Sequence, residues 1–382
     1  MRLVLHIGTE KTATTTLQHF LYHNRAALAA RGVVLSDVCG KPNNRWLAGY
    51  CQPDNKFDNF FRALGLANTA EKKAVLEDFP ERLQAEVAGL EGDVMVMTSE
   101  HCHSRLTDVQ ALTKLQDLLS PMFSDIRVIC YFREQAAVVK SLYSTAIKGG
   151  KTADFAEFLD TCTPKSLRYN YAASCDLWAD VFGRNALHPR LFLKDEMKDG
   201  DILADFLSVA GIDPAGLTRD FPNQNESLGA YGMMLGRVVN EVHPRYREDG
   251  TPNPIWQITK GAVLKSDLAQ EGQLSFAEAG DVYALFDSSN RDFAARYLMR
   301  PENPFPPLKG EAVALEPVPA EALETFWQGT MEAMRDAPIM VPKFAARLRK
   351  IARTLEAGDM PGPDDIRTLR RLAKMIKPKS PK

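Results

Sequence analysis

The sequence predicts an α/β protein with three layers, in which helices flank a central parallel sheet. Two observations predict it. Apolar runs within residues 2–7, 92–100 and 125–134 are typical of strands buried on both faces. A helical pattern follows each of these runs, and alternation of strands and helices is typical of parallel sheets with right-handed crossovers.

The remaining elements follow in order along the chain. Apolar residues at helical spacing predict a helix after the first strand that ends at Gly32, a common type of helix end. The further predicted elements are a short strand at 33–35, helical segments over 58–89, 107–119, 135–150 and 201–212, and a strand within 187–195.

Proline density rises over residues 299–310 and predicts a boundary. We therefore expect an α/β domain over residues 1–300. Residues 301–382 are expected to form a mainly helical C-terminal extension that ends in a basic tail, RTLRRLAKMIKPKSPK.

Composition excludes several classes of protein. The 382-residue chain is 45% hydrophobic with a formal net charge of -2, so no global charge indicates binding to nucleic acid or an anionic membrane. The sequence has no run of about eighteen apolar residues that would predict a transmembrane segment, and no signal peptide is evident, which predicts a cytoplasmic protein.

The six cysteines lack C-x-x-C spacing, which favours reduced thiols over disulfides or a zinc site.

Polar clusters follow three of the predicted strands: TEKTATTT, TSEHCH and FRE. In parallel sheets, ligands bind at the carboxyl ends of the strands. These clusters are therefore the predicted functional site.

The stretch GTEKTATTT, residues 8–16, lies at the first strand-to-helix turn. It lacks the second glycine of a Walker loop. Helix N-termini bind anions through unpaired N–H groups, and small side chains leave them accessible. We therefore expect a phosphate site made by Lys11 and the small residues that follow it, namely Thr12, Ala13, Thr14, Thr15 and Thr16, with Lys11 placed against a leaving oxygen.

A second anion site is predicted at the end of the strand within 125–134. Arg133 ends this strand, and Ser141 lies eight residues later on the next helix. Two anion sites at neighbouring strand ends predict a ligand with separated phosphates.

These motifs resemble a known family. KTATTT after the first strand resembles the K-[ST]-[GA]-[ST]-[TS] loop of sulfotransferases that use 3′-phosphoadenosine 5′-phosphosulfate (PAPS), and Arg133 with Ser141 resembles their 3′-phosphate site. The resemblance covers roughly residues 1–300. One departure is Thr16, where the cytosolic small-molecule enzymes usually carry tryptophan, which weakens a link to steroid or phenol acceptors.

The resemblance implies a P-loop-like sulfotransferase fold and a PAPS-dependent sulfotransferase of the bacterial branch. The enzyme would move a sulfuryl group from PAPS to a hydroxyl acceptor, with a saccharide or glycan as one candidate, and release 3′-phosphoadenosine 5′-phosphate (PAP). It also implies that no metal is needed. By analogy with phosphoryl transfer, Lys11 would neutralise charge on the departing phosphate.

The acceptor hydroxyl needs a base. Glu100, at the end of TSE, resembles the glutamate found at this point in bacterial members, and His101 and His103 are rivals. If the strand continued through H-C-H, these histidines would share a face and could bind a metal together, but no matching ligand pair occurs elsewhere.

Two other functions stay open. An ATP-dependent kinase-type enzyme would need a magnesium ligand, for which Glu100 and Asp125 are the candidates. A non-catalytic binding protein on the same fold is the other alternative.

Overall fold

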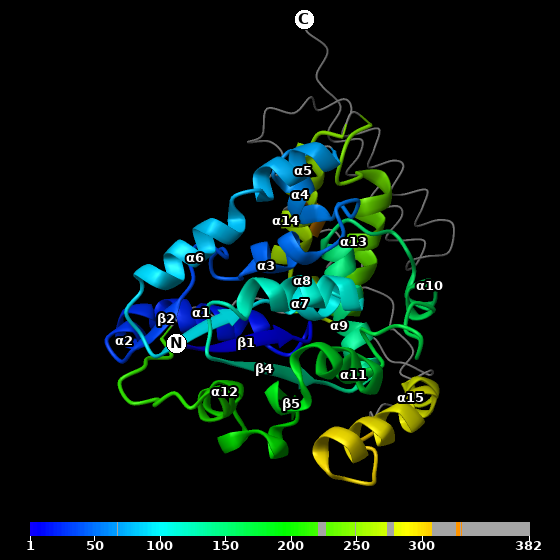
Figure 1. Ribbon diagram of the computed structural model, residues 1–382. Helices are drawn as coiled ribbons and strands as arrows, with labels where there is room; N and C mark the ends of the chain where they lie inside the picture. The colour runs from blue at the N-terminus through cyan, green and yellow to red at the C-terminus, as the bar shows by residue number, and fades with distance from the viewer. Residues whose placement is uncertain are drawn as a thin grey trace, which may run out of the picture. The chain divides into compact units, whose positions relative to one another are not determined.

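The computed structural model describes residues 1–66, 68–220, 227–248, 250–272, 279–307, 326–328 and 330. Five parallel strands form one sheet in the order β2-β3-β1-β4-β5 (Figure 1). The strands are β1 (Arg2–Gly8), β2 (Val33–Leu35), β3 (Val94–Thr98), β4 (Asp125–Phe132) and β5 (Leu187–Leu191). The predicted α/β class is confirmed.

Fifteen α-helices occur among the described residues. They are α1 (Thr14–His23), α2 (Arg25–Ala29), α3 (Arg45–Cys51), α4 (Asn59–Ala63), α5 (Thr69–Leu76), α6 (Phe79–Gly89), α7 (Glu100–Arg105), α8 (Val109–Leu119), α9 (Gln135–Lys148), α10 (Phe155–Leu159), α11 (Tyr171–Phe182), α12 (Ile202–Ala210), α13 (Ala230–Val242), α14 (Pro254–Lys265) and α15 (Ala279–Phe293).

The chain divides into two compact units. Unit 1 comprises Met1–Val138, Cys162–Asn225 and Asp281–Pro307, and unit 2 comprises Val139–Thr161, Glu226–Gly280 and Leu308–Lys382. The whole sheet belongs to unit 1. The expected domain boundary near residue 300 stays a prediction, and the expected helical extension and basic tail lie almost entirely outside the described residues.

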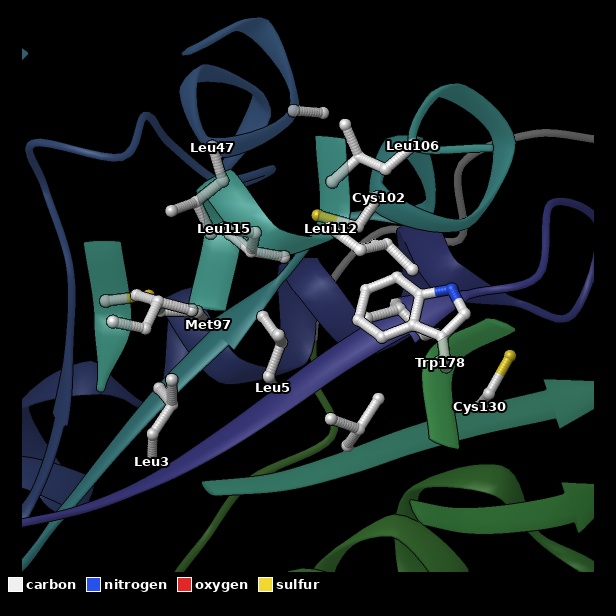
Figure 2. Packing of buried hydrophobic residues seen from close by; sticks show 14 of the residues in the cluster. Leu3, Leu5, Leu47, Met97, Cys102, Leu106, Leu112, Leu115, Cys130 and Trp178 are labelled. Atoms are coloured by element: carbon white, nitrogen blue, oxygen red, sulfur yellow. The ribbon is translucent and has the colours of Figure 1, made fainter. Parts of the chain in front are cut away.

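Both faces of the sheet are covered, because alternate residues of a strand point to opposite faces. On one face, Leu3, Leu5 and Ile7 of β1 pack into a core with side chains of α3, α6, α7, α8 and α11. Figure 2 shows Leu3 and Leu5 in this core with Leu112, Leu115 and Trp178. On the other face, Val4 packs with side chains of α1, α2 and α12. Three layers result, as predicted.

Unit 2 has a small core of its own. Tyr143 and Ile147 of α9 pack with Met233 of α13. Asn240 on α13 donates a hydrogen bond to the Ile147 carbonyl (2.8 Å) and accepts one from the Trp256 indole (2.7 Å). These bonds join α9, α13 and α14, so unit 2 is held by a helical core.

The predicted helix ending at Gly32 differs from the structure. It is broken at Asn24 into α1 and α2. The Asn24 amide donates to the Phe20 carbonyl and to the Thr218 carbonyl, both at 2.9 Å, and its oxygen accepts from the Thr218 N–H. The helix is therefore broken where Asn24 bonds to the distant backbone of Thr218, and a local sequence pattern does not show such a contact.

The six cysteines are all free and buried. Within the described part of the chain, no helix is both long enough and apolar enough to span a membrane.

Candidate functional site

The strand order brings the predicted clusters together. β1 lies between β3 and β4, and all three strands are parallel, so the segments that follow them leave the same edge of the sheet. After β1 the chain continues to β2 and β3 on one side, and then crosses to β4 and β5 on the other. This reversal is the position where open α/β sheets bind ligands.

The first loop, residues 9–13, is braced by its own polar groups. The Thr9 hydroxyl donates to the Tyr131 carbonyl (3.0 Å), and the Thr12 hydroxyl donates to the Thr9 carbonyl (2.7 Å). Lys11 and Ala13 have φ of 70° and 55°. Left-handed residues within a turn help to direct successive N–H groups towards one point, which is an arrangement that binds anions.

Helix α1 begins without a side-chain cap. Its N-cap residue is Ala13, which has no side-chain acceptor, and the first turn consists of Thr14, Thr15 and Thr16. The N–H groups of a first helical turn have no partner inside the helix and carry the positive end of the helix dipole. The N–H groups of this first turn therefore have no side-chain cap, and the predicted anion site at this loop stays a prediction.

Gly8 allows this loop to lie directly beside Glu100. A Cβ on Gly8 would stand 2.9 Å from the Glu100 Cα, and Gly8 has φ of 107°. A larger residue would clash with the backbone and adopt a strained conformation. The end of β1 and the start of α7 are therefore in close contact.

Glu100 is held by two amides that the sequence analysis did not find. Gln18 of α1 and Asn43 donate to the same oxygen, Oε2, at 2.7 and 2.8 Å. Asn43 also accepts from the Ser99 hydroxyl at 2.8 Å. These bonds hold the carboxylate in place through Oε2. Neither amide contacts the second oxygen, Oε1.

The Glu100 side chain is only 16% exposed. Burial raises the pKa of Glu100 above its usual value, with a smaller contribution from the charge of Glu10, although hydrogen bonds from its own backbone N–H and from Gln18 and the charge of Lys11 act to lower it. A carboxylate with a raised pKa is a stronger proton acceptor once ionised. Glu100 is therefore a buried carboxyl group with a raised pKa at the carboxyl edge of the sheet.

The two histidine rivals differ from Glu100. Both lie in helix α7 rather than in an extended strand, so the condition under which they would share a face is not met. Burial lowers the pKa of each to about 3. His103 is fully enclosed beside a cavity of about 10 Å³ lined by apolar residues such as Ile7 and Trp178. His101 lies nearer the site, with its Nε2 3.8 Å from Glu100 Oε1.

Arg133 follows β4, and its guanidinium donates to the Lys11 carbonyl at 3.1 Å. This bond ties the segment after β4 to the first loop. Arg133 belongs to unit 1 and Ser141 to unit 2, within α9. Their joint role at a ribose phosphate stays a prediction.

The next residue, Glu134, is a cap that the sequence analysis did not identify. Its carboxylate accepts from the N–H groups of Ala136 (2.9 Å) and Ala137 (2.8 Å) at the start of α9. These backbone donors therefore already have an anionic partner. The motif FRE contained the signal, since an acidic residue just before a helix is a common cap.

An ion pair lies beside the first loop. Arg168 approaches Glu10 at 3.2 Å.

Among the residues that the structure describes, no group of three or more histidine, cysteine or acidic side chains is arranged to hold a metal ion.

Comparisons with known proteins give limited similarity. No protein-family model matches the chain. An uncharacterized protein of Archaeoglobus fulgidus is 22% identical over 161 residues, which are 40% of this chain and 42% of that protein. The chain thus matches less than half of the relative's length. A crystal structure of a sulfotransferase from Alicyclobacillus acidocaldarius is similar with a TM-score of 0.39 and 15% identity, over 58% of this chain and 85% of that one.

Proposed function

We propose that this protein is a sulfotransferase that moves the sulfuryl group of PAPS to a hydroxyl acceptor. One observation carries the proposal: an uncapped helix N-terminus with Lys11 and a buried glutamate lie side by side at the carboxyl edge of the sheet. The first can hold a phosphosulfate, and the second can take a proton from an acceptor.

The residues of the first loop fit the donor. The phosphosulfate end of PAPS needs hydrogen-bond donors and positive charge. The donors would be the N–H groups of Thr14, Thr15 and Thr16, and the charge would come from the Lys11 ammonium. Arg133 supports the loop through the Lys11 carbonyl. Arg133 and Ser141 together remain the proposed ligands of the 3′-phosphate.

The proposed reaction has one transfer step. The acceptor hydroxyl oxygen forms a bond to sulfur, the bond between sulfur and the phosphate oxygen breaks, and PAP leaves. The hydroxyl proton goes to Glu100, whose Oε1 is not used by Gln18 or Asn43. Lys11 stabilises the negative charge that appears on the departing phosphate.

Calorimetric titration with PAP tests the donor site. We expect binding by the full-length protein, and a loss of about 1.5–3 kcal/mol in Lys11→Ala, the scale of a charged hydrogen bond. Lys41→Ala is the matched control, because Lys41 pairs with Asp37 on the surface. Absence of PAP binding in the unchanged protein would refute the proposal.

Transfer of labelled sulfate from PAPS to cell extracts tests the activity itself. Loss of labelled product in Lys11→Ala is the expected result. Magnesium-dependent ATP turnover without PAPS turnover would favour the kinase alternative instead.

A further inference from the structure

A cluster of polar and charged side chains lies next to Glu100 and is not used by the proposed reaction. It consists of Arg45 on α3, Arg105 and His101 on α7, and Asp58 before α4. Helices α3 and α7 pack against each other. All of these residues belong to unit 1.

The two arginines share one acid. Asp58 Oδ2 accepts from Arg45 Nη2 and from Arg105 Nε, the latter at 3.3 Å. Burial acts to raise the pKa of Asp58, but the two guanidinium groups hold it below its usual value. Asp58 is therefore ionised, and two positive charges face one negative charge.

His101 is neutral near neutral pH, so it adds no charge to the cluster. Burial, followed by the positive charges of Arg45 and Arg105, lowers the pKa of His101 to about 3. Glu100 Oε1 lies 3.8 Å from His101 Nε2, and the charge of Arg168 also acts on this ring. The arginines thus supply the positive charge beside the proposed base.

Several polar atoms here lack partners. Arg45 Nη1, His101 Nδ1 and Ser104 Oγ are buried and make no hydrogen bond within the described part of the chain. The Arg45 side chain is only 9% exposed. His101, Ser104 and Arg105 follow one another at helical spacing on α7, which places them on neighbouring positions of its surface. A buried donor without a partner is costly, so a cluster of such atoms indicates a missing ligand.

We propose that Arg45 and Arg105 form an anion subsite for the acceptor, which binds a carboxylate or sulfate group of the molecule whose hydroxyl meets Glu100. Guanidinium groups suit both anions because their planar N–H pairs match two oxygens. The substrate class is therefore an acidic sugar or a similar anionic alcohol. This inference rests on the proposed function, since it assigns the partner of Glu100.

An acidic acceptor also explains why the arginines lie at this place. An anion beside an ionised glutamate would be repelled, and two nearby cations offset that repulsion. Asp58 limits the strength of the subsite and keeps both guanidinium groups in position. Removing its charge should therefore strengthen anion binding, whereas a purely structural ion pair would give no such gain.

Titration with three sugars tests the subsite. Glucuronate, glucose 6-sulfate and glucose are added to the full-length protein at constant ionic strength, and the NMR signal of the His101 ring is followed, assigned with His101→Gln. We expect at least one charged sugar to shift this signal and glucose to leave it unchanged. The charged sugar that binds more tightly identifies the preferred anion. Equal binding of all three would overturn the inference.

Variants sharpen the result. Arg105→Met and Arg45→Met should each weaken charged-sugar binding at least tenfold, and Asp58→Asn should strengthen it several-fold. Arg127→Met is the control, because Arg127 pairs with Asp125 at the opposite end of β4. If Arg45→Met does not fold, Arg105→Met and Asp58→Asn still decide, because weaker binding in a folded Asp58→Asn would contradict the subsite.

PAP binding is measured in the same proteins. We expect the arginine variants to bind PAP as the unchanged protein does. If the unchanged protein does not bind PAP, the proposed function is refuted. If it binds PAP but binds neither charged sugar more tightly than glucose, only the subsite is refuted.

Discussion

Two helix starts at the same edge of the sheet differ in how their backbone donors are used. Helix α9 follows β4, and the Glu134 carboxylate accepts from the N–H groups of Ala136 and Ala137. Helix α1 follows β1, and its N-cap Ala13 provides no side-chain acceptor. The same strand-loop-helix unit thus carries an anionic cap in one case and no side-chain cap in the other.

The difference teaches where backbone amides can bind a phosphate. At α9 the internal carboxylate already occupies the position that a ligand would take, so any anion bound after β4 depends on side chains such as Arg133. At α1 no side-chain cap occupies that position, so these donors are the ones we propose for the phosphate of the ligand. The missing cap is what distinguishes the two loops.

The largest effect is expected from Glu100→Gln, which tests whether the uncapped loop has a base beside it. The substitution keeps the size of the side chain but removes the charge that accepts the proton. We expect kcat for sulfate transfer to fall by about 10²–10⁴-fold while PAP binding is unchanged. An effect of less than tenfold on kcat would exclude Glu100 as the base.

The next effect tests the comparison directly, by giving α1 an acid as α9 has. Ala13→Asp places a carboxylate at the start of α1, and asparagine and aspartate tolerate the left-handed conformation found there. We expect PAP affinity to fall by about 100-fold, because the new charge competes for the same donors and repels the ligand. Asparagine has the shape of aspartate without its charge, so Ala13→Asn should bind PAP much more tightly than Ala13→Asp does. Equal affinities would show that charge at this position does not matter.

Removing the cap of α9 should affect stability and not the nucleotide. Glu134→Ala leaves two N–H groups without their acceptor, and loss of a cap costs about 1–2 kcal/mol. We expect this decrease in the free energy of unfolding, measured by urea denaturation. Asp108→Ala, which removes the cap of α8, is a matched control and should cost a similar amount. A large loss of PAP affinity in Glu134→Ala alone would mean that the α9 start takes part in binding.

The smallest effect concerns the pH dependence of the reaction. The hydrogen bond from Gln18 lowers the pKa of Glu100, so Gln18→Met should raise that pKa further. A base acts only when ionised, and activity therefore falls as the pH drops through this pKa. The acidic limb of the kcat profile should move to higher pH by up to about one unit, the scale of one hydrogen bond to a charged group. A limb that stays in place would argue against Glu100 as the titrating group.

Much of the fold was predictable from local patterns. The buried strands at 2–7 and 125–134 consist of apolar runs, and strand alternation with helices specified a parallel sheet. The order of the strands required the structure, because it depends on which distant runs pair. That order nevertheless agrees with the prediction that the clusters after β1, β3 and β4 meet at one edge.

The predicted site residues, which stay predictions, each came from a local rule. Small residues after a strand predicted the loop of Lys11, and a polar residue after a strand predicted Glu100. The strand expected within 92–100 is shorter in the structure, because β3 ends at Thr98 and α7 begins at Glu100, which places His101 and His103 on a helix.

The sequence alone indicated the loop and the candidate base, because small residues and an acidic residue after a strand are local patterns. Only the tertiary structure decided what surrounds them. Gln18 and Asn43 lie 82 and 57 residues from Glu100 in the chain, and no local pattern marks an amide that will meet a distant carboxylate. Burial, which raises the pKa of Glu100, is likewise a property of the packed molecule.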